Sequence, residues 1–400
     1  MIRSFLTAAF VVGVQTGSAL ALDVSHHDQG REMATRAADF LRSQQDVATG
    51  GWSHNADGPN FPAISGLALT GLLMDPRIDA NDPTVRRGLD YVLSYRQSDG
   101  GIYDGALPNY NTAICLSALA LVHDADTGAA IQRAQNFLRG LQYHGTENSS
   151  AEAPDFTEPV PESHPFYGGV GYGRHGRPDL SNLGFFLQAL HDTGVSADDP
   201  AVQRALVFLS RTQMQDELND QPYADGSNQG GFIYATVPDH RSSDGFEGQS
   251  EAGDTIETLD DGTSVSRPLA YGTMSYTGFK SLIYADMKRD DPRVTAVRRW
   301  ISEHYTLDEN PGLGEQGLYY YYLALARALD AWGEDEIETR DPETGETTIH
   351  NWRTEMIDKL ASLQEGDGGF QVRQKRWMEN DRSLITSYAL IALQIATGSN

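Results

Sequence analysis

The stretch Gln364-Glu365-Gly366-Asp367-Gly368-Gly369-Phe370 lies between an amphipathic segment and a strongly apolar one. A looser copy, Gln97-Ser98-Asp99-Gly100-Gly101, lies in the same position earlier in the chain. Residues 45–52 and 229–232 repeat the pattern of a glutamine, two glycines and a large apolar side chain. Paired glycines end a helix and permit a turn with positive φ. Recurrence of this turn predicts a repeated helix–turn–helix unit.

The hydrophobic pattern around these turns predicts six such units. The first helix of each unit has apolar residues at i, i+3 and i+4, as an amphipathic outer helix requires. The second helix is apolar around most of its circumference, which is typical of a buried helix. The amphipathic segments are 37–41, 89–93, 134–138, 205–209, 297–301 and 357–360, and the apolar ones are 64–73, 112–122, 180–190, 275–284, 318–329 and 384–395.

Three Asp-Pro pairs stand between units, at Asp82-Pro83, Asp199-Pro200 and Asp291-Pro292. Aspartate is a good N-cap and proline a good first helical residue. We therefore assign these carboxylates to capping of the next outer helix rather than to catalysis.

The turns Gln364-x-x-Asp367-Gly368-Gly369-Phe370 and Gln97-Ser98-Asp99-Gly100-Gly101 resemble the Gln/Trp-type repeats of squalene cyclases and the matching turns of protein prenyltransferase β-subunits. The resemblance extends over nearly all of residues 22–400. It implies an all-α fold, an (α/α)6 toroid in one domain. The inner helices of such a toroid would line a central ligand cavity, with their N-termini at its mouth.

Two insertions interrupt the repeats. Residues 145–166 are rich in Glu, Pro and Ser and are expected to form a surface loop. Alternating residues near Phe232 and Thr263 predict a small β-hairpin or lid within residues 214–266. The acidic residues of this second insertion lack the spacing of a calcium loop, so neither a metal nor a cofactor is predicted.

The order of residues 1–21 is typical of a cleaved signal peptide, with a basic start, an apolar run and small residues up to Ala21. A secreted or periplasmic protein is therefore expected. The net charge of −26 argues against nucleic-acid partners. No apolar run reaches the ~20 residues that span a bilayer, so stable membrane insertion is not expected. The lone Cys115 is expected to be a buried small side chain.

The motifs that carry the chemistry of the resembling families are absent. There is no Asp-x-Asp-Asp, and the acidic pairs that begin at Asp198, Asp260 and Asp290 lack a third carboxylate for magnesium. Cys115 has no neighbouring acid to complete a zinc site of the prenyltransferase type. The stretch Gly312 to Gln316 resembles the thioester motif of complement-like proteins, with Leu313 in place of the thiol.

Polar and aromatic residues before or at the start of the apolar helices are the candidates for a site at the mouth. Tyr319 and Tyr320 are the expected cavity-facing members of the run Tyr319 to Tyr322. Trp52 could instead pack its own turn. The Arg174–Arg177 loop is compatible either with anion binding or with charge balance, and Glu315 is also compatible with helix capping. The candidate catalytic residues are Glu315, Tyr319, His175 and Asp381, and the candidate ligand-binding residues are Trp52, His54, Tyr110, Asn111, Arg174, Arg177, Tyr271, Tyr276, Gln316, Tyr320, Trp377 and Arg382, while Tyr172 and Asp179 also precede the third apolar helix.

Three functions remain compatible with the sequence. The resemblance favours an exported toroid enzyme acting on an isoprenoid-like or other apolar substrate. The Arg174–Arg177 cluster is compatible instead with a lyase-like enzyme acting on acidic glycans. A non-catalytic binding or scaffold protein is the third hypothesis, since a fold does not decide function. The expected partner is thus a small lipid or glycan ligand.

Overall fold

The computed structural model describes residues 22–53, 58–122, 125–145, 156–174, 176–239, 245–259, 261–341 and 344–398. The predicted signal peptide and the candidates His54 and His175 lie outside these residues. Within them the chain forms inner helices α2 (Pro62–Leu73), α4 (Pro108–Ala120), α6 (Leu180–Asp192), α8 (Gly272–Tyr284), α10 (Leu318–Trp332) and α12 (Arg382–Ala396), and outer helices α1 (Val24–Gln44), α3 (Pro83–Ser94), α5 (Ala125–Gly140), α7 (Pro200–Thr212), α9 (Pro292–His304) and α11 (Trp352–Leu363).

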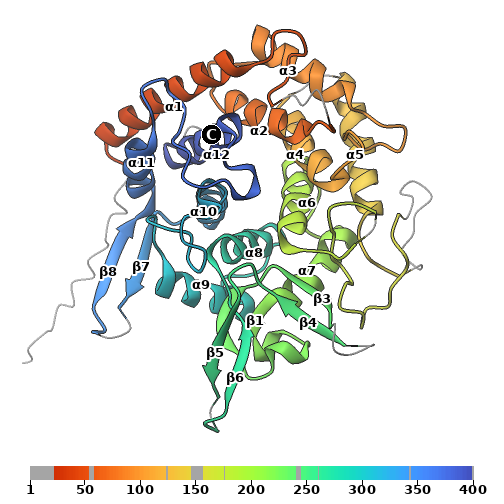
Figure 1. The fold of residues 1–400 in the computed structure, drawn as a ribbon, viewed down its shortest axis with the longest axis vertical. Coiled ribbons are helices and arrows are strands. Elements are labelled where there is room, and N and C mark those ends of the chain that lie inside the picture. The colour runs from red at the N-terminus through yellow and green to blue at the C-terminus, as the bar shows by residue number, and fades with distance from the viewer. Residues whose placement is uncertain are drawn as a thin grey trace, which may run out of the picture.

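The six inner helices form a closed ring (Figure 1). Each packs against the next in the order α2, α4, α6, α8, α10 and α12, and α12 packs back against α2. The outer helices surround this ring, with α3 against α2, α5 against α4, α9 against α8, and α1 and α11 against α12. The predicted α/α toroid of six helical hairpins is confirmed.

Burial explains why the two kinds of helix occupy different layers. α2 buries every residue from Pro62 to Leu72, and α12 buries every residue from Ser383 to Ala396. α3 buries only one stripe, which includes Val85, Leu89 and Val92. A helix that is apolar all round requires cover on every side, whereas an amphipathic helix supplies that cover with one face.

A glutamine at the end of an outer helix fastens each of four repeat turns. Its Nε2 donates to a carbonyl in the glycine turn and to another in the following outer helix. The fourth unit uses Gln213 in this role, not Gln229, and the third uses Gln142 with Gly168. At Gly168, with φ +81°, an added Cβ would lie 1.9 Å from the carbonyl oxygen of Arg204, so glycine is required there. The donor pairs are Gln45 to Gly50 and Thr84, Gln142 to Gly168 and Ala201, Gln213 to Gly230 and Arg293, and Gln364 to Gly368 and Met33.

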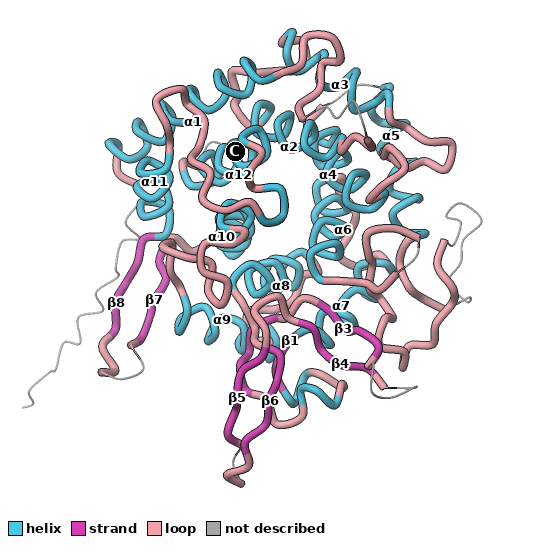
Figure 2. Tube along the Cα trace, in the orientation of Figure 1, coloured by secondary structure: helices cyan, strands magenta, loops and turns pink. Residues whose placement is uncertain are grey.

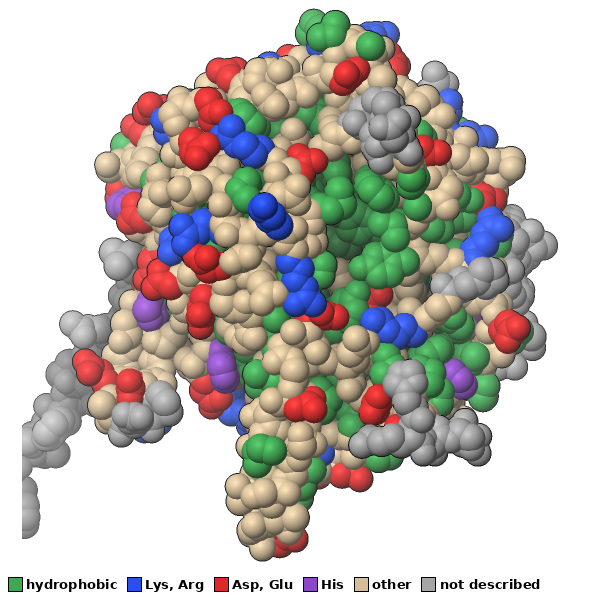
Figure 3. Space-filling view, in the orientation of Figure 1, with side chains coloured by type: hydrophobic (Ala, Val, Ile, Leu, Met, Phe, Trp, Pro, Cys, Tyr) green, Lys and Arg blue, Asp and Glu red, His purple; other side chains and the backbone are tan. Residues whose placement is uncertain are grey.

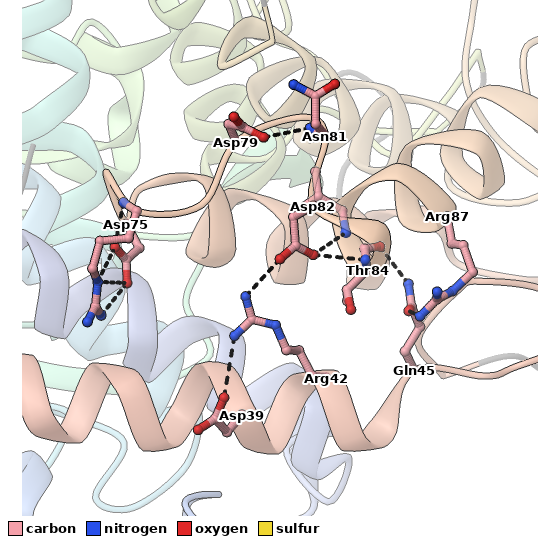
Figure 4. Close-up of polar contacts among 11 residues, drawn as sticks. Asp39, Arg42, Gln45, Asp75, Asp79, Asn81, Asp82, Thr84 and Arg87 are labelled. Atoms are coloured by element: carbon pink, nitrogen blue, oxygen red, sulfur yellow. Dashed lines mark hydrogen bonds and ion pairs between the residues drawn. The ribbon is translucent and has the colours of Figure 1, made fainter.

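The Asp-Pro pairs cap outer helices as predicted. Oδ1 of Asp82 accepts hydrogen bonds from the backbone of Thr84 at 2.8 Å and of Val85 at 3.2 Å (Figure 4). Its other oxygen accepts from Arg42 of α1, which also contacts Asp39. The Asp199 and Asp291 carboxylates cap α7 and α9 in the same way.

Among the described residues, four small antiparallel strand pairs lie in the connections between the helices of the ring. They are β1 (Gln213–Gln215) with β2 (Asn228–Phe232), β3 (Ala235–Pro238) with β4 (Phe246–Gln249), β5 (Asp254–Thr258) with β6 (Ser264–Pro268), and β7 (Glu336–Arg340) with β8 (Thr347–Asn351). The strands predicted within residues 214–266 are therefore present. The sequence does not predict the β7–β8 hairpin. Ile337 is its only buried side chain, so the apolar pattern of these strands is weak. Figure 2 shows β5–β6 and β7–β8 projecting outward from the ring.

Candidate active site

A cavity of about 240 Å³ lies where the N-terminal halves of the inner helices converge. Every inner helix contributes at least one side chain to its wall, as the predicted position of the mouth requires. Figure 3 shows the mouth as a hollow lined by hydrophobic side chains, with charged side chains around its rim. The wall consists of Phe61, Ile64, Leu107, Tyr110, Tyr172, Ser181, Phe185, Tyr234, Glu251, Tyr271, Thr273, Met274, Leu313, Gly317, Tyr320, Trp377, Met378, Glu379, Leu384 and Tyr388.

Four aromatic rings from separate inner helices form a continuous part of this wall. Phe185 stacks on Tyr320 with ring centroids 5.5 Å apart and meets Tyr110 edge-on at 5.3 Å. Tyr388 lies 5.8 Å from Tyr320. The hydroxyls bond to neighbours, Tyr110 to Tyr388 at 3.3 Å and Tyr320 to Ser181 at 3.0 Å. Loss of contact with water raises the pKa of Tyr110 to about 12, so this phenol stays neutral at physiological pH.

Glu379 is the carboxyl group of the cavity that the sequence did not reveal. It is 1 % exposed and follows the loop after α11. Oε1 accepts hydrogen bonds from the backbone N–H groups of Tyr319 at 3.1 Å and Tyr320 at 3.0 Å, at the start of α10. Oε2 is buried and has no hydrogen-bond partner among the described residues. Burial raises the pKa of Glu379 to about 7, although the α10 backbone donors favour its ionised form.

The loop that presents Glu379 has an unusual backbone. Trp377 and Met378 have φ of 53° and 66°, in the left-handed region that side chains other than glycine rarely adopt. Such residues cost on the order of 1–3 kcal/mol each and are held by the surrounding structure. The Trp377 ring packs on the backbone of Gly317, where an added Cβ would lie 2.9 Å from it. The contact fixes the loop against the start of α10, where Glu379 bonds.

A second buried carboxyl lies behind the cavity wall at the start of α6. Asp179 is fully buried and accepts bonds from the backbone of Asn182 at 2.8 Å and from its amide. Burial raises the pKa of Asp179 to about 6, while bonds from Asn182 and from the Tyr234 hydroxyl and the charge of Arg177 act in the opposite direction. The Tyr234 hydroxyl in turn lies 3.3 Å from that of Tyr172. Both tyrosines line the cavity, so this carboxyl is connected to it through phenol groups.

Four of the sequence candidates line the cavity: Tyr110, Tyr271, Tyr320 and Trp377. Of the two tyrosines expected to face it, Tyr320 does so. Tyr319 does not, because its hydroxyl donates to the carbonyl of Gln371 at 2.6 Å and its ring packs against Phe370.

Three other candidates are buried away from the cavity. Trp52 packs its turn and donates Nε1–H to the carbonyl of Leu41 at 2.7 Å. Asn111 joins the starts of α2 and α4 by bonds to Ala63 and Ala106. Tyr276 packs edge-on against Tyr321. Their positions serve the packing of the ring.

Most charged candidates are engaged with neighbours of opposite charge or with backbone groups. Arg174 pairs with Asp99 and lies 4.2 Å above the Phe156 ring, which favours charge balance over anion binding. Arg177 lies over the Tyr234 ring at 5.0 Å. The remaining contacts are those of Glu315 with Arg373, Gln316 with Arg376, Arg382 with Glu365 and Asp367, and Asp381 with Ser53 and the start of α12.

Metal sites and membrane spans can be assessed only for the described part of the chain. There, no three His, Cys, Asp or Glu side chains are grouped so that they could hold a metal ion. Over the same residues, no helix is both long enough and apolar enough to cross a bilayer.

The fold and the cavity together define a helical toroid protein with a largely apolar cavity, and comparison with known proteins agrees with this fold class. A squalene–hopene cyclase of Bradyrhizobium diazoefficiens is 26 % identical over 187 residues, which are 44 % of this chain but only 28 % of the cyclase. No protein-family model matches the sequence.

Solved structures share the fold at low identity. A family 76 glycoside hydrolase from a bovine Bacteroides thetaiotaomicron strain superposes with a TM-score of 0.55 and 10 % identity, over 92 % of this chain and 78 % of the hydrolase. An alpha-amylase from Clostridium perfringens superposes with a TM-score of 0.50 and 13 % identity, over 94 % of this chain and 99 % of the amylase. Such identities show the fold alone. The chain has a squalene cyclase-like α/α-toroid fold, and the same architecture is found in glycan-active enzymes.

Proposed function

We propose that the protein is an enzyme that protonates an alkene of an apolar, isoprenoid-like substrate and thereby starts its cyclisation or isomerisation. Glu379 is the proton donor. One observation carries the proposal: a carboxyl group lies in the wall of an aromatic cavity with one oxygen buried and unbonded within the described part of the chain. The sequence likeness to a squalene–hopene cyclase supports the same reaction class.

The surroundings of Glu379 suit a carboxylic acid more than a carboxylate. A carboxylate that served only to cap α10 would be expected to bond or to hydrate both oxygens, because an ionised oxygen left unpaired in the interior is costly. Here Oε1 takes both backbone bonds and Oε2 takes none among the described residues. With a pKa of about 7, a large fraction of the group keeps its proton at neutral pH.

The remainder of the wall suits the intermediate that protonation creates. Transfer of the Oε2 proton to an alkene carbon leaves a carbocation on the substrate and a carboxylate on Glu379. The faces of aromatic rings attract cations, most strongly where water is excluded. Tyr110, Phe185, Tyr320 and Tyr388 line the cavity, and the three tyrosine hydroxyls bond to one another or to Ser181. These aromatic rings stabilise the cation and are not themselves charged nucleophiles that would trap it.

A glycan is a poorer fit to the same wall. Sugar hydroxyls require many directional hydrogen bonds, and unpaired polar groups lose affinity on burial. Apart from tyrosine hydroxyls and the indole N–H of Trp377, the described lining offers only Ser181, Glu251, Thr273 and Glu379 as polar side chains, and Glu251 is paired with Arg376. The cavity volume of about 240 Å³ falls just below the ~300–1,000 Å³ of typical ligand pockets, which favours a short isoprenoid chain.

The test is conversion of a panel of acyclic isoprenoids from geraniol to squalene, together with neutral and acidic oligosaccharides, with products identified by mass spectrometry. The parent protein is expected to convert one or more isoprenoids to an isomer of equal mass. Glu379→Gln should lower that rate by at least ~10²-fold, the usual contribution of a general acid. The matched control Glu303→Gln changes an exposed residue of α9 and should keep the parent rate. Conversion of oligosaccharides alone, or full activity of Glu379→Gln, would contradict the proposal.

A further inference from the structure

The proposed reaction leaves one chemical requirement unassigned. A carbocation formed by protonation has to lose a proton, or capture a nucleophile, before a neutral product can leave. Glu379 lies at the start of α10, and the second buried carboxyl, Asp179, lies at the start of α6. α8 stands between these two helices in the ring, so the two carboxyl groups lie at the starts of helices that are not neighbours.

We infer that the Tyr234 hydroxyl, backed by the Asp179 carboxylate, is the base that ends the reaction by removing a proton from the substrate cation. This inference rests on the proposed function and names a catalytic residue for it. Asp179 does not line the cavity itself, whereas Tyr234 does, so Tyr234 is the group that touches substrate and Asp179 acts through it.

The hydrogen-bond inventory of the three groups permits this transfer. The Asn182 backbone and amide hold the Asp179 carboxylate. The backbone N–H of Leu180, the residue after Asp179, donates to the carbonyl of Tyr234 at 2.8 Å, which places Tyr234 beside Asp179. The Tyr234 hydroxyl favours the ionised form of this carboxyl and so lowers its pKa. A phenol has one proton to donate and two lone pairs. When Tyr234 donates to Asp179, Tyr172 at 3.3 Å can donate to one lone pair of Tyr234. One lone pair of the Tyr234 oxygen then remains for a proton from the substrate.

The step balances as a relay. A C–H bond next to the cationic carbon breaks, and its electron pair forms the new C=C bond. The released proton goes to the Tyr234 oxygen as the original phenol proton goes to Asp179. The substrate cation becomes a neutral alkene, Tyr234 ends as a phenol, and Asp179 ends protonated. After product release, Asp179 loses its proton to solvent and Glu379 regains one, so the net reaction is an isomerisation.

The local charges favour this direction of transfer. Arg177 lies 5.0 Å above the Tyr234 ring and its charge favours the ionised form of Asp179 before the step. The positions of the two carboxyls set their roles. Glu379 lines the cavity and has an oxygen without a partner among the described residues, so it is the acid. Asp179 lies behind the wall beside Tyr234, so it is the final proton acceptor.

The test measures product ratios rather than rate alone. The parent protein and the variants Tyr234→Phe, Asp179→Asn and Tyr172→Phe are incubated with the isoprenoid that the parent converts. The ratio of the parent's alkene to alcohols and other alkenes is measured by gas chromatography with mass detection. Tyr234→Phe and Asp179→Asn should each lower this ratio at least fivefold while substrate is still consumed, and Tyr172→Phe should lower it less. Tyr95→Phe is the matched control, because Tyr95 also bonds a tyrosine hydroxyl at 3.3 Å but lies on the outside of the ring.

The possible outcomes separate the role of Tyr234 and Asp179 from the role of Glu379. Parent product ratios in both Tyr234→Phe and Asp179→Asn would overturn the relay but leave the role of Glu379 intact. A folded Tyr234→Phe protein that forms no product would also overturn it, since protonation of the substrate does not need the terminal base. A parent protein that converts no isoprenoid would overturn both proposals. Melting curves show whether each variant folds. If Tyr234→Phe does not fold, the product ratio of Asp179→Asn tests the relay in its place.

Discussion

Replacing Glu379 with glutamine should stabilise the protein at high pH and much less at low pH. Glutamine is similar in shape to the protonated acid and keeps an oxygen for the backbone donors of Tyr319 and Tyr320. Unlike glutamate, it carries no charge that burial would penalise. A buried acid whose replacement raises stability is one that the fold holds at a cost, as functional groups often are.

The magnitude follows from the change in pKa on folding. Burial raises the pKa of Glu379 from 4.5 to about 7, and one pKa unit corresponds to ~1.4 kcal/mol. Between these values the folded state holds a proton that the unfolded chain releases, so the free energy of unfolding decreases as the pH rises. At pH 8 the penalty reaches roughly 3 kcal/mol, and at pH 5 it is below about 1 kcal/mol. Because Glu379 is 1 % exposed, solvent screening does not reduce this value greatly.

Urea unfolding of the parent and Glu379→Gln proteins at pH 5 and pH 8 measures the effect. The advantage of the variant should grow by roughly 2 kcal/mol between the two pH values. Asp179, whose pKa burial also raises, is present in both proteins and cancels in the difference. Glu303→Gln on the exposed face of α9 should show no such pH dependence. Equal stability changes at pH 5 and pH 8 for Glu379→Gln would refute the reasoning.

Three further predictions concern the ring itself. Trp52→Ala should lower the free energy of unfolding by ~3–5 kcal/mol, because it removes a fully buried ring and its bond to Leu41; a loss below about 1 kcal/mol in urea would contradict the packing role. Asp82→Ala should cost ~1 kcal/mol by loss of the α3 cap, and a cost equal to that of an exposed Asp→Ala change elsewhere would contradict it. Cys115 should resist a thiol reagent such as DTNB in the folded protein and react in urea, since burial both shields the thiol and raises its pKa; fast labelling of the native protein would contradict this.

The sequence predicts the ring because its information is periodic. Each unit carries a helix pattern and most carry the glycine turn, and these local signals suffice to place all the inner helices. The glutamine contacts were harder to assign. An insertion separates Gln142 from Gly168 and another separates Gln213 from Gly230, so the pair that acts together is not adjacent in sequence.

The chemical centre was harder to find because it depends on contacts between distant residues. Glu379 bonds the backbone of residues 319 and 320, about sixty positions earlier, and no local pattern indicates that contact. One signal was available. α10 begins after Gly317, which has no side chain to cap it, so a capping group had to come from another segment. The sequence pattern indicates polar and aromatic residues at the helix starts instead, although a buried carboxyl is the group whose proton affinity folding changes most.

The most direct test of the account is to run the parent reaction in D₂O. If the Glu379 carboxyl starts the reaction, its exchanged deuteron becomes a carbon-bound deuterium, and each product molecule formed from an isoprenoid should be one mass unit heavier than in H₂O. The Glu379→Gln protein, which is expected to be folded at pH 8, should form no labelled product. Product that carries no deuterium, or labelled product formed equally well by Glu379→Gln, would contradict the claim that this buried acid is the proton donor.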